Sequence, residues 1–237
     1  MDGLGTILGV WAHPDDETYL AAGLMADAVR RGDRVVCITA TRGEGGSLDE
    51  ERWPPETMGA VREAELMRCF DLLGVTEHHW LDLVDVDMET PLADEGYEKV
   101  RAIMAEVRPD TVLTFGPDGM TGHAGHASVC DWATRAAAEA GAPGTAVHYA
   151  TATPEWADEF VPIYNRFDVF RPGTPPVTPV EDLSINLILP PDLLELKLAA
   201  IQEHESQVWA MVEAFGEDFF RRAMNVETFR LGAVTPG

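Results

Sequence analysis

The chain is short of positive charge. Of its 237 residues, 17 are lysine or arginine and 41 are aspartate or glutamate, which gives a formal net charge of −24. Lys99 and Lys197 are the only lysines. Because nucleic acids and anionic membrane surfaces attract basic proteins, this balance argues against both as partners. It also disfavours a strongly anionic substrate.

Long apolar runs and cysteine pairs are also missing. No apolar run is long enough to span a membrane, and no basic region precedes the first apolar segment. We therefore expect neither a membrane span nor a signal peptide. Cys37, Cys69 and Cys130 have no metal-type spacing and lie in apolar or helical stretches. We interpret them as reduced core residues, and we expect a cytoplasmic protein.

Two common sequence signatures of enzymes on α/β folds are absent as well. No G-x-G-x-x-G fingerprint follows the first apolar run, and Gly43 to Gly46 lack the Lys-Ser/Thr of a phosphate-binding loop. A nucleotide-binding oxidoreductase or transferase is therefore only a weak alternative. The chain also has no G-x-S-x-G nucleophile elbow, which disfavours a serine hydrolase.

What the sequence does have is an alternation of strand-like and helix-like segments. Strands are predicted near residues 7–12, 34–40, 79–81, 111–115, 146–150 and 184–189. Helices are predicted near residues 17–31, 56–73, 95–107 and 124–140, and from Pro191 onward. This alternation predicts a single α/β domain over residues 1–237, with a doubly wound, Rossmann-like, mostly parallel sheet and helices on both faces. We expect its core over 5–155 and a C-terminal loop, strand and helices over 156–237, with residues 160–179 as an ordered loop or insertion.

One polar stretch stands where the first strand should end and the first helix begin. It reads Ala12-His13-Pro14-Asp15-Asp16-Glu17. In open parallel sheets, ligands bind outside the carboxyl ends of the strands. An imidazole and three carboxylates in one turn are costly unless they bind something, and both side-chain types are zinc ligands. The alternative interpretation is that Asp15 or Asp16 merely caps the helix.

A second polar loop follows the strand predicted over 111–115. It is rich in glycine and contains His123 and His126, whose spacing lets them face one way at the start of a helix. Because both loops lie at the same edge of a parallel sheet, we expect the two sites to meet.

Together, the A-H-P-D-D-E stretch and the later G-H-x-x-H resemble the LmbE-like, or PIG-L-like, family of metal-dependent de-N-acetylases. Members of this family remove acetyl or acyl groups from amino sugars. Further segments resemble family motifs, namely T-R-G-E-x-G at residues 41–46, R-x-x-E at 62–65 with L-G-V at 73–75, L-x-x-x-D at 81–85, and K…H-x-S-Q at Lys197, His204, Ser206 and Gln207.

The resemblance implies a role for each residue of the two polar loops. His13, Asp16 and His126 would be the ligands of Zn²⁺, or of Fe²⁺ or another divalent ion, since the ligand set does not discriminate strongly. Asp15 would be the general base that takes a proton from the metal-bound water. His123 would stabilise the oxyanion or protonate the leaving amine.

The resemblance also implies a substrate. Arg62 and Asp85 would bind the sugar of a small-molecule N-acyl amino sugar, and the reaction would be metal-dependent hydrolysis of its amide. The sequence leaves a homo-oligomer open. It also leaves open whether His204 is functional or only packs a helix end.

One position departs from the family pattern, which usually has Asp two residues after the first histidine. Gly125 stands at that position. Because a nearby carboxylate raises the pKa of an imidazole, we expect His123 to be protonated less often near neutral pH, unless Asp118 replaces the missing carboxylate. The departure keeps a second class of function open, a non-catalytic metal- or sugar-binding module of the same fold.

Overall fold

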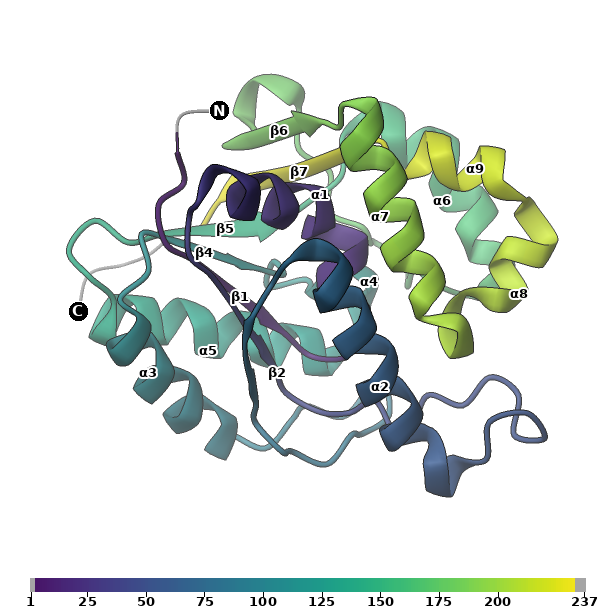
Figure 1. Cartoon of the computed structure of the whole chain (residues 1–237), viewed down its shortest axis with the longest axis horizontal. Coiled ribbons are helices and arrows are strands. Elements are labelled where there is room, and N and C mark those ends of the chain that lie inside the picture. The colour runs from purple at the N-terminus through teal and green to yellow at the C-terminus, as the bar shows by residue number, and fades with distance from the viewer. Residues whose placement is uncertain (1–2, 233–237) are drawn as a thin grey trace.

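One seven-stranded sheet forms the centre of the computed structural model, which describes residues 3–232 (Figure 1). The strands are β1 (Ile7–Trp11), β2 (Val35–Thr39), β3 (Glu77–Trp80), β4 (Thr111–Thr114), β5 (Ala146–Ala150), β6 (Ile185–Ile188) and β7 (Val226–Leu231). Their order across the sheet is β3-β2-β1-β4-β5-β7-β6. Strands β1 to β5 are parallel, while β7 runs antiparallel to both β5 and β6.

Helices cover both faces of this sheet. They are α1 (Asp16–Arg31), α2 (Pro55–Leu73), α3 (Glu95–Val107), α4 (Gly119–Gly122), α5 (Ala124–Ala140), α6 (Pro154–Tyr164), α7 (Pro191–Glu203), α8 (Glu205–Phe215) and α9 (Glu217–Ala223). Helices α3 and α5 pack together on one face, and α1, α2 and α7 pack together on the other (Figure 1). The predicted α/β fold, with its mostly parallel sheet, is therefore confirmed.

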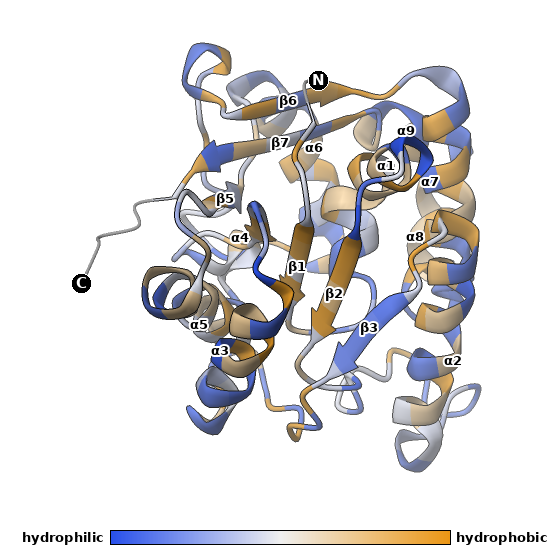
Figure 2. Cartoon of the chain, turned by 60° about the vertical axis from the view of Figure 1, so that its left-hand side comes forward, coloured by the Kyte–Doolittle hydropathy of each residue, from blue (hydrophilic) through white to orange (hydrophobic). Residues whose placement is uncertain are grey.

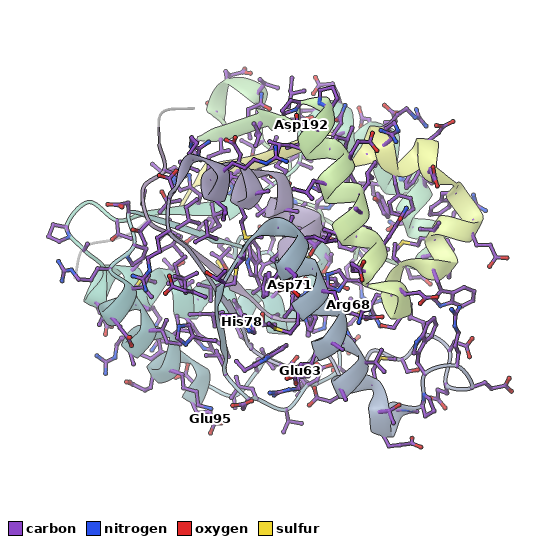
Figure 3. The ribbon with its side chains drawn as sticks, viewed as in Figure 1. Glu63, Arg68, Asp71, His78, Glu95 and Asp192 are labelled. Carbon is purple, nitrogen blue, oxygen red and sulfur yellow. The ribbon has the colours of Figure 1, made fainter. Side chains whose placement is uncertain are left out.

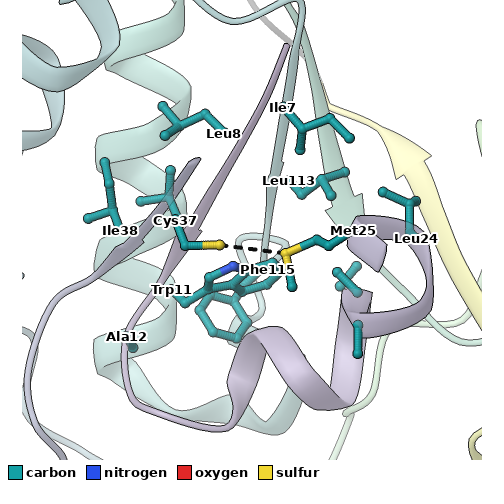
Figure 4. Packing of buried hydrophobic residues seen from close by; sticks show 14 of the residues in the cluster. Ile7, Leu8, Trp11, Ala12, Leu24, Met25, Cys37, Ile38, Leu113 and Phe115 are labelled. Carbon is teal, nitrogen blue, oxygen red and sulfur yellow. Dashed lines mark hydrogen bonds between the residues drawn. The ribbon is translucent and has the colours of Figure 1, made fainter. Parts of the chain in front are cut away.

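The core lies between the sheet and its helices. All residues of β1 and β2 are buried, and both strands are strongly apolar (Figure 2), as expected of parallel strands covered on two faces. Trp11 meets Phe115 edge to face at 5.4 Å between ring centroids. Beside this pair, the Cys37 thiol donates to the Met25 sulfur at 3.5 Å (Figure 4). Cys37, Cys69 and Cys130 are all buried, as predicted.

Charged side chains cover the outer surface of the helices. Arg68 and Asp71 are exposed on α2 (Figure 3), where Arg68 binds Glu203 at the end of α7 at 2.6 Å. Exposed pairs of this kind contribute only about 0–1 kcal/mol each, so packing holds the helices in place. Within residues 3–232, we find no helix that is both long enough and apolar enough to cross a membrane.

The segment after β5 differs from the sequence prediction. The loop predicted from residue 160 is wrong for 160–164, because α6 continues to Tyr164. Thr153 caps the start of this helix, because its hydroxyl accepts the Trp156 N–H at 3.2 Å, and Pro154 is the first helical residue. Strand β7 was not predicted, because its alternating sequence contains Glu227, which is buried but charged.

The strand order reverses at β1. This strand has β2 on one side and β4 on the other, so the connections leave it in opposite directions. Such a switch point opens a crevice at the carboxyl ends of the strands. The two polar loops of the sequence follow β1 and β4, so the fold brings them to the two sides of this crevice.

Candidate active site

The first polar loop turns sharply after β1. Asp15, just before α1, has φ of 102°, a backbone conformation that L-residues rarely adopt. Its carbonyl nonetheless accepts the N–H groups of Thr18 and Tyr19, each at 2.9 Å. The turn folds Asp16 back, so that its Oδ2 accepts the His13 N–H at 2.8 Å. Backbone strain of this kind is concentrated at functional sites.

The second loop fixes the ring of His126. This residue lies in the first turn of α5, and its ring stacks between Phe115, at 4.1 Å, and His123, at 4.7 Å. Its Nδ1 lies 2.9 Å from the Gly119 carbonyl oxygen, which can only accept a hydrogen bond. The proton of the neutral ring is therefore on Nδ1, which leaves the Nε2 lone pair free to bind a metal.

The three residues predicted as metal ligands converge between the two loops. His13 Nδ1 lies 3.2 Å from His126 Nε2. Asp16 Oδ2 lies 3.6 Å from the first nitrogen, and Asp16 Oδ1 lies 3.5 Å from the second. With bonds of about 2.0–2.2 Å to zinc, the donors of a tetrahedral site are roughly 3.2–3.6 Å apart, so the two nitrogens have the spacing of zinc ligands and the Asp16 carboxylate faces both of them.

Asp85 lies on the far side of His13 from the converging donors. Its Oδ1 is 3.1 Å from His13 Nε2, and its Oδ2 accepts the Gly45 N–H at 3.1 Å. A carboxylate on the second nitrogen orients a metal-binding imidazole and fixes its tautomer. The structure thus gives Asp85 a contact that sequence reasoning did not predict, and it also places Asp85 in the wall of the cavity described below.

Electrostatics favour a cation at the point of convergence. Burial lowers the pKa of His13, but Asp16 and Asp85 outweigh burial and raise it to about 9. Burial raises the pKa of Asp16, but His126 and His13 bring it well below its usual range. Burial lowers the pKa of His126 to about 4. Without an ion, the site therefore holds a proton on His13, at the position where a metal would bind.

His123 lies beside the rings of His13 and His126, but it does not make their contacts with Asp85 and the Gly119 carbonyl. One nitrogen each of His13, His123 and His126 lie within 4.8 Å of one another, so distance alone does not exclude His123 as a ligand. However, His123 Nδ1 accepts the Gly125 N–H at 3.0 Å. Burial and the charge of His13 lower the pKa of His123. Asp118 does not support it, because its carboxylate accepts the Met120 N–H at 2.7 Å instead.

Asp15 and Arg62 meet at the rim of the site. Asp15 Oδ2 lies 3.3 Å from Arg62 Nη2, and that nitrogen also donates to the Pro14 carbonyl at 2.6 Å. Burial raises the pKa of Asp15 to about 6, although Arg62 opposes the rise. Arg62 Nη1 donates to Gly43, where φ is +64° and a Cβ would lie 2.2 Å from the guanidinium. Glycine is therefore required there, and Arg62 holds the turn that carries Asp15.

A second group of potential metal ligands lies buried behind the first turn of α1. Glu17, Cys69 and His204 each offer an atom within 4.8 Å of the others. The Thr18 hydroxyl contacts all three, at 2.6, 2.9 and 3.0 Å respectively. Because a hydroxyl occupies the centre of the group, we interpret it as a buried polar network that joins the end of α7 to α1.

A cavity of about 450 Å³ opens from the convergence point. All seven predicted site residues line it. Its remaining wall includes residues that sequence reasoning missed, among them Tyr19, Trp156, Tyr164, Phe170 and Met211. Only Tyr19 had a signal in the sequence, because it lies one helical turn after Asp15. The other four come from helices and a loop whose positions the local sequence pattern does not reveal.

Comparison with known proteins is decisive for the family. The model of the family described as "PIG-L: GlcNAc-PI de-N-acetylase" matches residues 8–138, more than half of the chain. The chain belongs to the PIG-L family. The matched PIG-L region runs from β1 to α5 and contains all the predicted site residues.

Named PIG-L relatives are similar over part or most of the chain. A 1D-myo-inositol 2-acetamido-2-deoxy-alpha-D-glucopyranoside deacetylase of Corynebacterium glutamicum is 34% identical over 140 residues, which is 51% of this chain and 48% of that protein. The match thus spans about half the length of this relative. The protein of the same name from Saccharomonospora viridis is 29% identical over 240 residues, covering 88% of this chain and 87% of the relative.

A solved structure has the same fold. The N,N'-diacetylchitobiose deacetylase of Pyrococcus horikoshii superposes with a TM-score of 0.65 at 23% identity. The likeness covers 99% of this chain and 85% of that one. It therefore extends the shared fold beyond α5 to the C-terminal strands and helices.

Proposed function

We propose that this PIG-L protein is a metal-dependent hydrolase that removes an acetyl or acyl group from an N-acyl amino sugar. One observation carries the proposal. His13 Nδ1, His126 Nε2 and the Asp16 carboxylate converge within 3.2–3.6 Å of one another. Beside them lies Asp15, a carboxylate that this convergence does not use. The names of the relatives support N-acetylglucosamine derivatives as the class of substrate.

His13, Asp16 and His126 would hold the ion, for which zinc is our first candidate and Fe²⁺ an alternative. When bound, such an ion polarises the amide carbonyl and lowers the pKa of a coordinated water to about 7. Three protein ligands leave room for water and substrate, as in other catalytic sites. His123 is left out of this set because its Nδ1 already accepts the Gly125 N–H.

Asp15 serves as the general base. Its pKa of about 6 lies close to neutral pH, which suits a group that must accept a proton and then release it. It accepts the proton of the attacking water and passes it to the leaving amine. Arg62 keeps this carboxylate in place by its contact with Asp15 Oδ2 at 3.3 Å and by its hydrogen bond to the preceding Pro14 carbonyl at 2.6 Å.

His123 stabilises the developing oxyanion as a neutral donor. Because its Nδ1 accepts the Gly125 N–H, its own proton lies on Nε2, and its lowered pKa keeps the ring neutral. A donor aimed at the developing charge is commonly worth about 2.7–4 kcal/mol in a transition state. In this assignment, His123 does not need the carboxylate that Gly125 replaces.

The substrate is expected to be neutral. Asp15, Asp16, Asp85 and Asp87 line the cavity, and Arg62 donates to two backbone carbonyls within the protein. Carboxylates around a site repel anionic groups such as phosphate. The buried cysteines agree with a reducing compartment, and the cytoplasmic location stays a prediction. Whether the protein forms a homo-oligomer stays open.

The test is amine release from N-acetylglucosamine and its glycosides. We expect activity that is lost on chelation and restored by zinc. Asp15→Asn should keep the metal but lose about 10²–10⁴ in kcat, because it removes the base and not a ligand. Asp71 is an exposed aspartate on α2, and Asp71→Asn is the matched control, which should change neither the metal content nor kcat.

Two results would contradict the proposal. A fully metal-loaded protein that releases amine from no N-acyl amino sugar would favour the non-catalytic binding module. An Asp15→Asn variant as active as Asp71→Asn would mean that Asp15 is not the base.

A further inference from the structure

The cavity has two unlike walls. The wall near the convergence point is polar and includes Asp15, Arg62, Asp85 and His123. A second part of the lining, which we call the aromatic chamber, consists of Tyr19, Trp156, Tyr164, Phe170, Met211 and Met224. These residues come from α1, α6 and α8, from the loop that follows α6, and from the end of α9, and α6, α8 and α9 gather at one side of the molecule (Figure 1).

The polar atoms of the aromatic chamber are engaged or hidden. Trp156 Nε1 donates to the Ala223 carbonyl at 2.8 Å. The hydroxyl oxygens of Tyr19 and Tyr164 are buried and have no hydrogen-bond partner among the described residues, so they offer a ligand no accessible polar atom. The chamber therefore offers a ligand mainly apolar surface.

Glu227, at the back of the cavity, is neutralised within the protein. Its Oε1 accepts from Lys197 Nζ at 2.8 Å and from the Gly23 N–H at 2.8 Å, and its Oε2 accepts the Leu24 N–H at 2.7 Å. This carboxylate is thus committed to α1 and α7, and it does not make the chamber a site for a cation.

The aromatic chamber is also held open by its own packing. The rings of Trp156 and Tyr164 stack at 5.9 Å, and Phe170 meets Tyr164 edge to face at 6.0 Å. Behind them, Phe219 contacts Tyr164 at 5.2 Å. Interlocked aromatic rings form a preformed surface, which a ligand need not order at its own cost.

We infer that the aromatic chamber binds the acyl chain of the substrate, and that this chain is longer than acetyl. The inference rests on the proposed function. Sugar hydroxyls suit the polar wall, and an apolar acyl chain is the part of the substrate that suits the chamber. The cavity of about 450 Å³ must hold the sugar as well as the acyl group, and its size lies within the roughly 300–1,000 Å³ of pockets that take drug-sized ligands. An acetyl group offers one methyl to the six side chains of the chamber, whereas a longer chain can contact more of them.

The chemistry stays that of amide hydrolysis. The water oxygen bonds to the carbonyl carbon, the C–N bond breaks, and the nitrogen takes a proton. The products are a free amino sugar and a carboxylate with a longer chain. Each methylene buried in the chamber should strengthen binding about fourfold, which gives a steep dependence on chain length.

The experiment is an acyl-chain series on one sugar. N-acetyl-, N-butyryl-, N-hexanoyl- and N-octanoylglucosamine are compared by kcat/KM for amine release. We expect at least a tenfold rise from acetyl to octanoyl. Met211→Trp, which fills the chamber, should lower the octanoyl-to-acetyl ratio at least tenfold, and Met211→Phe is the milder variant if the first does not fold. Met67→Trp, at an exposed methionine on α2, is the matched control and should leave the ratio unchanged.

The outcomes separate this inference from the proposed function. Falling rates along the series, or an unchanged ratio in the folded Met211 variant, would overturn the acyl assignment while leaving the hydrolase intact. The acyl assignment would also be overturned if kcat/KM rose only when an octyl chain was attached to the anomeric oxygen of N-acetylglucosamine, and not when the acyl chain was lengthened. If no amide is cleaved, the proposed function fails. In that case, calorimetry with the chelated protein tests whether the chamber binds the acyl chain. At least tenfold tighter binding of N-octanoylglucosamine than of N-acetylglucosamine would support the inference, and equal binding would overturn it.

Discussion

At the scale of single residues, the site depends on which nitrogen of each histidine is free. His13 gives Nε2 to Asp85 and turns Nδ1 toward the centre, whereas His126 gives Nδ1 to the Gly119 carbonyl and turns Nε2 there. The two residues therefore use opposite ring atoms. Residue spacing in the sequence cannot reveal which ring nitrogen is free. For His13 it is set by Asp85, which is distant in the sequence, and for His126 it is set by the backbone carbonyl of Gly119.

The charge on His13 leads to a prediction about metal binding. In the metal-free protein its pKa is about 9, so it is protonated at pH 6, whereas His126, with a pKa of about 4, is neutral. Since the metal needs an unprotonated nitrogen, binding at pH 6 should release one proton from His13, and part of a second from Asp15, whose pKa is about 6. Affinity should rise as pH increases toward 9. Calorimetry in buffers of different ionisation enthalpy measures this proton count. A count of zero at pH 6 would mean that His13 is neutral before the metal binds.

Gly125 allows a direct test of His123. A Cβ at residue 125 would lie 3.1 Å from His123 Nδ1, so any side chain there presses on the ring. Gly125→Asp adds both this crowding and a carboxylate, whereas Gly125→Ala adds the crowding alone. Because a carboxylate favours imidazolium, only Gly125→Asp should move the limb of the pH–rate profile governed by His123 to higher pH.

The same comparison is repeated in a His123→Ala background, where the shift should vanish. Identical profiles for the folded, metal-loaded Gly125→Asp and Gly125→Ala proteins would show that His123 does not titrate in the reaction.

At the scale of elements, the sequence is most informative where each strand is followed by its own helix. Apart from the short helix α4, the strands and helices from β1 to α5 were predictable, because buried parallel strands are short apolar runs and helices repeat their apolar residues at a different period. The position of both polar loops at one sheet edge then follows from parallel topology. The convergence of His13, Asp16 and His126 was predictable to that extent.

The C-terminal third is less predictable, because its elements depend on distant partners. Strand β7 contains the buried Glu227, which local pattern rules place outside a core. It is tolerated because Lys197, on α7, and two N–H groups of α1 neutralise it. Likewise, Glu65 on α2 accepts from the N–H and hydroxyl of Ser206 at 2.8 and 2.7 Å, which fixes the start of α8. Neither pairing can be recognised from the residues that neighbour its partners in the sequence.

The buried pair makes a prediction about stability. Lys197 Nζ and Glu227 Oε1 are 2.8 Å apart, and the two side chains are 1% and 0% exposed. Lys197→Met would leave the carboxylate unpaired, so the free energy of unfolding should fall by about 3–5 kcal/mol. Lys99→Met removes the other lysine, which is exposed and donates to the Leu81 carbonyl, and should cost only about 1 kcal/mol. Urea denaturation compares them, and equal losses would show that the pair does not stabilise the fold.

At the scale of the whole molecule, the proposed catalytic residues and the aromatic chamber come from different parts of the chain. The PIG-L match covers residues 8–138, which contain all seven predicted site residues. Apart from Tyr19, the aromatic chamber comes from residues 156–224, outside that match. If the proposed assignments hold, we expect variation among relatives in residues 156–224 to change the acyl group that is accepted and not the metal that is bound.

The central claim of this account is that His13, Asp16 and His126, and not His123, hold one divalent ion. The most direct measurement is the metal content per chain of the purified protein and of four folded variants. We predict about one ion for the parent protein and for His123→Ala, and loss of the ion in His13→Ala, Asp16→Ala and His126→Ala. Full metal in any of the last three, or its loss in His123→Ala, would contradict the account.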